Sequence, residues 1–221
     1  MVSRLTKLII ARHGNTFNAG DTPTRVGART DLPLVEQGCE QAKALGRYLK
    51  KHDLTPDAVY CSSLKRTRQT AELALREMGV KEHIYALDIF NEIDYGVDEN
   101  MSEDKVIARI GKEAIENWDK HAIAPDGWDV NPDEIVQNWL NFSNQIAKTH
   151  DEITNHVLDI SEVILVVTSN GIARFAPHIT GDFEGFSDKF SIKLSTGAFG
   201  ILEQNQGKWR VTDWNIKPSL K

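Results

Sequence analysis

The apolar run VILVV at residues 163–167 is the feature that most constrains the fold of this chain. It passes at once into Thr168-Ser169-Asn170-Gly171 and then into a segment with a helical pattern. A short continuous run of β-branched and aliphatic residues is typical of a strand that is buried on both faces, as in parallel sheets covered by helices. Ligands of such sheets bind beyond the carboxyl ends of the strands. The small polar residues after this strand therefore predict a site.

Strand-like and helix-like patterns alternate along the rest of the chain. Strands are expected at 5–11, 58–61, 84–87 and 163–168, and helices at 36–51, at 64–78 and from 131 onward. The last of these begins with a capping residue, a proline and a glutamate, which are typical of a helix start. Residues 196–215 surround the turn Gln206-Gly207 and predict an antiparallel hairpin at a sheet edge. This order predicts an α/β fold, a three-layer sandwich whose mainly parallel sheet is flanked by helices.

The length of the chain, 221 residues, fits one α/β domain that covers residues 1–221. Residues 91–132 are rich in charge, glycine and proline, and we expect them to form an insert or lid over one end of the sheet. Residues 15–34 have the composition of a long loop. Substrate specificity would be set in these two segments.

Bulk composition excludes several classes of protein. The net charge of −6 argues against binding to nucleic acid or to an anionic membrane. Cys39 and Cys61 form no C-x-x-C pair, so we expect neither a disulfide framework nor a zinc knuckle. No apolar run is long enough for a signal peptide or a membrane span. The expected location is the cytoplasm.

Charged, polar and small residues gather at the expected carboxyl ends of the strands. They include Arg12, His13, Thr16, Ser62, Arg66, Glu92, Asn170 and Gly171. Arginines, a histidine, hydroxyls and backbone amides that converge on one point form an anion site, for which a phosphoryl group is a natural ligand. A histidine among arginines can attack phosphorus, and a nearby carboxylic acid can protonate the leaving oxygen.

Each of these residues also has a more ordinary explanation. An arginine-histidine pair at a strand end is usually a surface pair, and most glutamates like Glu92 are simply solvated. Asn170-Gly171 is most often a plain turn or helix cap. Arg66 at a helix start is unfavourable for the helix dipole, which slightly favours a functional role. Their joint position at strand ends is what favours a site.

Four motifs in chain order resemble those of the histidine phosphatase superfamily, which includes cofactor-dependent phosphoglycerate mutases and fructose-2,6-bisphosphatases. LIIARHGNT resembles its R-H-G motif, and GARTDLPLVEQGCEQAKALGRYL its G-x-x-D-x-P-L-T-x-x-G-x-x-Q-A segment. DAVYCSSLKRTRQTAEL is similar to its S-x-L-x-R-x-x-Q-T-A motif, and NEIDYG to its E-x-D-F-G segment. VILVVTSNGIAR aligns with the strand before the second histidine of the family. The resemblance implies a phosphoglycerate mutase-like fold.

The resemblance also implies roles for individual residues. His13 would be the nucleophile that carries the phosphoryl group, Arg12 and Arg66 would clamp the phosphoryl oxygens, and Glu92 would be the general acid and then the base for water. Further positions that would face phosphate or substrate are Gly14, Thr16, Asn18, Arg25, Gly27 and Gly171. No metal and no cofactor is implied.

Asn170 departs from the family, whose usual text is V-S-H-G with a histidine that donates to the phosphoryl group. An amide can still donate a hydrogen bond, but it carries no positive charge. The loss corresponds to roughly ten- to thirtyfold in rate, and to a hundredfold or more if the donor acts like an oxyanion-hole group. We expect that the family's second histidine is not replaced in the pocket by His83, His121, His156 or His178.

Three functions remain open on these grounds. The first is a phosphatase for a small phosphorylated metabolite, and the second is a phosphoglycerate mutase, although the longer basic middle segment expected of mutases is absent. The third is a degenerate protein that binds phosphate without turnover, which the retained His13 and Glu92 disfavour. An engineered change at Asn170 is also open, and the edge hairpin could pair with a second copy of the chain.

Overall fold

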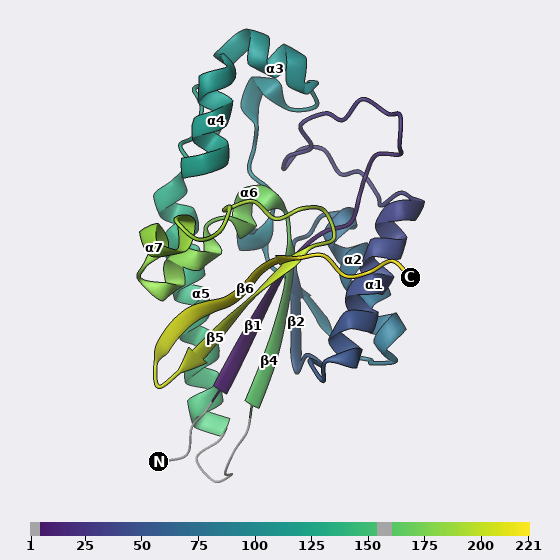
Figure 1. Ribbon diagram of the computed structural model, residues 1–221, viewed down its shortest axis with the longest axis vertical. Coiled ribbons are helices and arrows are strands. Elements are labelled where there is room, and N and C mark those ends of the chain that lie inside the picture. The colour runs from purple at the N-terminus through teal and green to yellow at the C-terminus, as the bar shows by residue number, and fades with distance from the viewer. Residues whose placement is uncertain (1–4, 154–160) are drawn as a thin grey trace.

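The computed structural model describes residues 5–153 and 161–221 (Figure 1). Six strands form one mixed sheet in the order β3-β2-β4-β1-β5-β6. The strands are β1 Leu5–Arg12, β2 Ala58–Cys61, β3 Ile84–Ala86, β4 Ser161–Thr168, β5 Phe199–Asn205 and β6 Lys208–Ile216. The first four are parallel to one another, whereas β5 is antiparallel to β1 and to β6. The predicted α/β fold and its edge hairpin are therefore confirmed.

Helices cover both faces of this sheet (Figure 1). The α-helices are α1 Glu36–Lys51, α2 Lys65–Met78, α3 Glu103–Ile110, α4 Lys112–His121, α5 Pro132–Ile153, α6 Asn170–Ala173 and α7 Phe183–Ser187. Three 3-10 helices add η1 Asp88–Phe90, η2 Gly96–Asp98 and η3 Ala176–Thr180. None of the helices in the described ranges is long and apolar enough to cross a membrane.

Alternate residues of the central strands enter two separate cores. Leu8 and Ile10 of β1 pack with the aromatic core around α4, α5 and α6. Ile9 and Ala11 pack with the apolar faces of α1 and α2 on the opposite side of the sheet. Because a strand exposes successive side chains to opposite faces, an uninterrupted apolar strand needs a helical layer on each side.

The register of β1 and β4 brings two polar segments together at one edge of the sheet. Arg12 lies opposite Thr168, and the backbone N–H of His13 donates to the Thr168 carbonyl at 3.0 Å. The segments that follow these strands are therefore neighbours, although more than 150 positions separate them in the sequence. Helices α3 and α4 rise beyond this same end of the sheet (Figure 1).

Two glycines allow the turn after β1 to approach helix α1. A Cβ at Gly14 would lie 2.3 Å from the Gly38 carbonyl oxygen, and a Cβ at Gly38 would lie 2.2 Å from the Asn15 carbonyl oxygen. Real side chains do not tolerate such distances from backbone atoms, so this close approach requires glycine on both sides. The approach fixes the backbone next to His13.

Candidate active site

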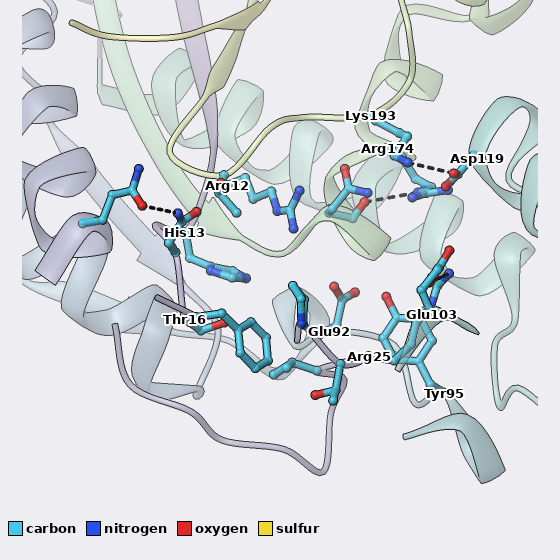
Figure 2. Close-up of a pocket in the computed structure, with 18 of the residues that line it drawn as sticks. Arg12, His13, Thr16, Arg25, Glu92, Tyr95, Glu103, Asp119, Arg174 and Lys193 are labelled. Carbon is cyan, nitrogen blue, oxygen red and sulfur yellow. Dashed lines mark hydrogen bonds and ion pairs between the residues drawn. The ribbon is translucent and has the colours of Figure 1, made fainter. Parts of the chain in front are cut away.

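A pocket of about 490 Å³ opens at this edge of the sheet. It is lined by Arg12, His13, Asn15, Thr16, Phe17, Asn18, Ala19, Pro23, Thr24, Arg25, Val26, Gln37, Glu92, Tyr95, Glu103, Trp118, Asp119, Asn170, Arg174, Lys193 and Thr196. The side chains come from the strand ends, the 15–34 loop, the α3 and α4 insert and the loop before β5. Figure 2 shows His13 and Arg12 facing Glu92 across it.

His13 has the geometry of a neutral nucleophile. Its side chain is 6% exposed, and its Nδ1 lies 2.7 Å from the Gly14 carbonyl oxygen. A carbonyl can only accept, so we assign the proton to Nδ1 and the lone pair to Nε2. Burial lowers the pKa of His13 well below its usual value, and the charges of Arg66 and Arg12 lower it further. The ring points into the pocket (Figure 2), and Nε2 has no hydrogen-bond partner among the side chains and backbone groups that the structure describes.

The surroundings of Glu92 favour its protonated form, whereas those of His13 favour the deprotonated form. It is 6% exposed, and its Oε1 and Oε2 accept from the backbone N–H groups of Ile93 at 3.0 Å and Gly171 at 3.2 Å. Burial raises the pKa of Glu92, although Arg66 and the two backbone N–H groups act against this rise. A carboxyl with a raised pKa near a neutral histidine is suited to donate a proton and later to accept one.

The two predicted phosphate-clamping arginines differ in position. Arg12 lines the pocket and its Nη1 donates to the Leu194 carbonyl at 2.8 Å. Arg66 is fully buried and is not among the residues that line the pocket. Its Nη atoms donate to the backbone carbonyls of Thr30 at 2.8 Å and Gly27 at 3.2 Å. Arg66 therefore supports the loop at the mouth of the pocket, and its charge acts on His13 and Glu92. Its Nε has no hydrogen-bond partner among the described residues, and its role as a phosphoryl clamp stays a prediction.

Asn170 is held in one orientation by a backbone amide. Its Oδ1 accepts from the Leu194 N–H at 2.9 Å. This bond assigns the oxygen and nitrogen of the amide, because an N–H cannot donate to an NH₂ group. The Nδ2 of Asn170, a residue of the pocket wall, is then available as a neutral hydrogen-bond donor.

The other predicted residues divide into two groups. Thr16, Asn18 and Arg25 line the pocket. Gly14, Gly27 and Gly171 do not, and each is used structurally. The Gly14 N–H donates to the Thr70 hydroxyl, the Gly27 N–H to Glu99 and the Gly171 N–H to Glu92.

Several pocket residues were not predicted from the sequence. Tyr95, Glu103, Trp118 and Asp119 come from the charged insert, where no motif marks them. Arg174 lies four residues after Asn170, a spacing that places two side chains on the same side of a helix. That spacing could have identified Arg174 as a second residue of the site.

Among the histidines whose side chains the structure describes, His13 alone lines the pocket. His178 stacks on Phe183 with ring centroids 3.8 Å apart, and His83 and His121 are exposed. His156 lies outside the described residues. Within the described ranges, no group of three or more His, Cys, Asp or Glu side chains is placed to hold a metal ion.

The chain belongs to the histidine phosphatase superfamily, because the model of its branch 1 matches residues 8–217. It is 26% identical over 216 residues to the "uncharacterized phosphatase PhoE" of Bacillus subtilis (strain 168), which covers 98% of this chain and 97% of that protein. It is 33% identical over 177 residues to a 2,3-bisphosphoglycerate-dependent phosphoglycerate mutase of Methylobacterium sp. (strain 4-46), with 79% of this chain and 80% of the relative covered.

A solved structure supports the same fold. The native structure of a mycobacterial glucosyl-3-phosphoglycerate phosphatase superimposes with a TM-score of 0.73 at 18% identity, over 96% of this chain and 99% of that one. At this identity the likeness concerns the fold alone. The superfamily comprises phosphatases and phosphoglycerate mutases, so this chain is similar to enzymes of phosphoryl transfer.

Proposed function

We propose that this protein is a phosphohydrolase that acts through a phosphohistidine on a small phosphorylated metabolite. One observation carries the proposal: a neutral histidine with a free Nε2 and a carboxyl of raised pKa line the same pocket. Binding of phosphate alone needs neither group. An account without turnover therefore leaves both unexplained.

The reaction proceeds in two displacements at phosphorus. In the first, His13 Nε2 forms a bond to phosphorus while the bond from phosphorus to the ester oxygen breaks, and Glu92 transfers its proton to that oxygen. In the second, the Glu92 carboxylate accepts a proton from water as the water oxygen attacks phosphorus. The bond from phosphorus to Nε2 then breaks, inorganic phosphate leaves and the histidine is neutral again.

Asn170 acts in this scheme as a neutral donor to a phosphoryl oxygen. The Leu194 N–H holds the amide oxygen, so the NH₂ group needs no reorganisation when charge develops on the phosphoryl group. Donors that are oriented in advance are worth more than mobile ones. The amide thus supplies the directional part of the contact that a histidine would make, without the charge.

The relatives support both hydrolysis and mutase activity as candidates. A phosphoglycerate mutase is the second candidate, because a relative of that name is 33% identical over most of both chains. A mutase must keep water away from the phosphohistidine and rebind its intermediate, whereas a phosphatase must admit water. The relative with the broader coverage is named a phosphatase.

A panel of phosphate esters tests the proposal. We expect the wild type to release inorganic phosphate from at least one small phosphomonoester, and His13→Ala to abolish this release. Net isomerisation of phosphoglycerate that depends on a bisphosphate primer would establish the mutase instead. If the protein binds inorganic phosphate but neither hydrolyses any ester nor forms an acid-labile adduct, it is a binding protein.

A further inference from the structure

Glu99 is a partly buried carboxylate near the pocket that the scheme above does not use. It follows the 3-10 helix η2, does not line the pocket and contacts the mouth loop, residues 15–34. Its Oε1 accepts from three donors of that loop, which are the Gly27 N–H at 3.0 Å, the Arg29 N–H at 3.2 Å and the Thr30 hydroxyl at 2.7 Å. Its Oε2 accepts from the Tyr95 N–H at 3.3 Å. One side chain thus fastens the mouth loop to the segment around Tyr95.

The same part of the mouth loop holds Arg66. Arg66 Nη1 donates to the Thr30 carbonyl at 2.8 Å, and Nη2 donates to the Gly27 carbonyl at 3.2 Å. Gly27 and Thr30 therefore each contact Glu99 through a donor and Arg66 through a carbonyl. Burial lowers the pKa of Arg66, and nearby carboxylates, among them Glu99, oppose this effect. Two residues of the loop thus connect a fixed anion to a buried cation.

The loop also packs closely on the backbone beside Glu92. The Ala28 N–H donates to the Ile93 carbonyl at 3.0 Å, and a Cβ at Gly27 would lie 2.6 Å from the same oxygen. A guanidinium group is rigid and planar, so the carbonyls that hold both Nη atoms of Arg66 also fix its Nε. That Nε is buried and has no partner among the described residues. It is therefore left for an acceptor that arrives with the substrate.

We propose that Glu99 is a positioning residue that sets the guanidinium of Arg66 for the phosphoryl group through the backbone of the mouth loop. The inference rests on the proposed function, because it takes Arg66 as a clamp on the phosphoryl oxygens. The Glu99 carboxylate holds Gly27 and Thr30, and their carbonyls hold Arg66. Without that carboxylate the carbonyls, and Arg66 with them, can shift. Misplacement of a substrate contact by about 1 Å can cost about a hundredfold in rate.

The test is a double-mutant cycle between positions 99 and 66. Glu99→Ala removes the acceptor, Glu99→Gln keeps one oxygen for the loop donors, and Arg66→Met removes the guanidinium group. Asp98→Asn is the matched control, because Asp98 is the neighbouring carboxylate and accepts from Arg109 and Trp128 elsewhere in the insert. The measurements are kcat/KM for p-nitrophenyl phosphate, the Kd for inorganic phosphate and the melting temperature.

We expect Glu99→Ala to lower kcat/KM and phosphate affinity by about ten- to a hundredfold, and Glu99→Gln to retain most of both. In the Arg66→Met background, Glu99→Ala should change either quantity by no more than about twofold, because the group that it positions is gone. Asp98→Asn should lower the melting temperature and have the same effect on kcat/KM in both backgrounds. Equal effects of Glu99→Ala in both backgrounds would overturn the proposal, because a purely structural role predicts additivity. A Glu99→Gln variant as impaired as Glu99→Ala would also overturn it.

A milder variant covers the case in which Glu99→Ala or Arg66→Met does not fold. Thr30→Val removes one donor to Glu99 and keeps the size of the side chain. The Nε–H NMR signal of Arg66 should move or broaden in Thr30→Val, and an unchanged signal would overturn the proposal.

The proposed function and the role of Glu99 fail on different results. A wild type that hydrolyses no ester, but shows the coupling of positions 99 and 66 in phosphate affinity, contradicts the proposed hydrolysis and leaves the role of Glu99 standing. Hydrolysis with additive effects at the two positions overturns the role of Glu99 alone.

Discussion

Asn170→Asp tests most directly whether the Asn170 amide donates to the phosphoryl group, because it exchanges one NH₂ group for an oxygen. The new carboxylate keeps the size of the side chain and keeps an oxygen for the Leu194 N–H, which Asn170 Oδ1 accepts at 2.9 Å. The fold should therefore tolerate the change. On the pocket side, a donor becomes a negative charge that faces the phosphoryl group.

The expected loss of transition-state stabilisation in Asn170→Asp has two contributions. The lost neutral hydrogen bond is worth about 1 kcal/mol. Two like unit charges about 4 Å apart repel by about 4 kcal/mol at an effective dielectric constant of about 20. Arg12 and Arg66, whose charges act on His13 and Glu92, screen part of this repulsion, so we expect kcat/KM to fall between about a hundredfold and a thousandfold.

The assay compares three variants at position 170 with p-nitrophenyl phosphate, together with their melting temperatures. Asn170→Ala removes the donor and also leaves the Leu194 N–H without its partner, so it should cost about 1–3 kcal/mol of stability as well as activity. Asn170→His should raise activity or leave it unchanged. If folded Asn170→Asp is as active as the wild type, the amide does not face the phosphoryl group and the reasoning fails.

Three further predictions concern the residues around Asn170. Glu92→Gln should lower kcat/KM for alkyl phosphates far more than for p-nitrophenyl phosphate, because only a poor leaving group needs a proton; an equal loss of kcat/KM, which does not contain the shared hydrolysis of the phosphohistidine, would contradict an acid role. The pKa of His13 is lowered in the folded state, so the unfolded chain binds more protons below its ordinary pKa of about 6.5. The free energy of unfolding should thus fall as the pH drops from about 6.5 toward the folded-state pKa of His13, and His13→Ala should remove this part of the loss in denaturant titrations. Gly14→Ala should cost about 1–3 kcal/mol of stability and most of the activity, because its Cβ would lie 2.3 Å from the Gly38 oxygen. Gly46→Ala creates a matching clash away from the pocket, where its Cβ would lie 2.3 Å from the Ala74 oxygen, so it should lower the melting temperature and spare the activity of the folded protein.

The central sheet and its helices could be predicted from the sequence because their buried apolar residues recur at the regular spacings of strands and helices. Helix α1 and strand β2 have the bounds expected from apolar spacing, and Gly79 ends α2 in a left-handed conformation with φ of 76°. The turn Gln206-Gly207 adopts positive φ at both residues, as a tight hairpin requires. In these segments local preference and burial agree.

The insert could not be predicted in the same way, because its helices bury very little. Helix α3 buries Val106 alone, and α4 buries Ile115 and Trp118. Such sparse apolar positions give no helical period in a segment dominated by charge. The insert nevertheless supplies Tyr95, a pocket residue, in a short 3-10 region.

The sequence likewise predicts only part of the candidate site: it predicts which residues follow the strands, but not where buried side chains point. The strand ends predicted that Arg12, His13 and Glu92 lie near one another, because parallel strands share a carboxyl edge. No sequence pattern shows where the donors of a buried arginine point. Arg66 directs its Nη atoms to the mouth loop, whereas Arg174 lines the pocket.

Trapping of the phosphorylated enzyme tests the central claim most directly. The wild type is mixed with a ³²P-labelled substrate identified in the ester panel, quenched in alkali at single-turnover times and mapped by peptide digestion. The account predicts an acid-labile, alkali-stable label on His13, formed and lost at rates that match turnover, and no label in His13→Ala. Turnover without any label on His13, or a label on another residue, would contradict the account.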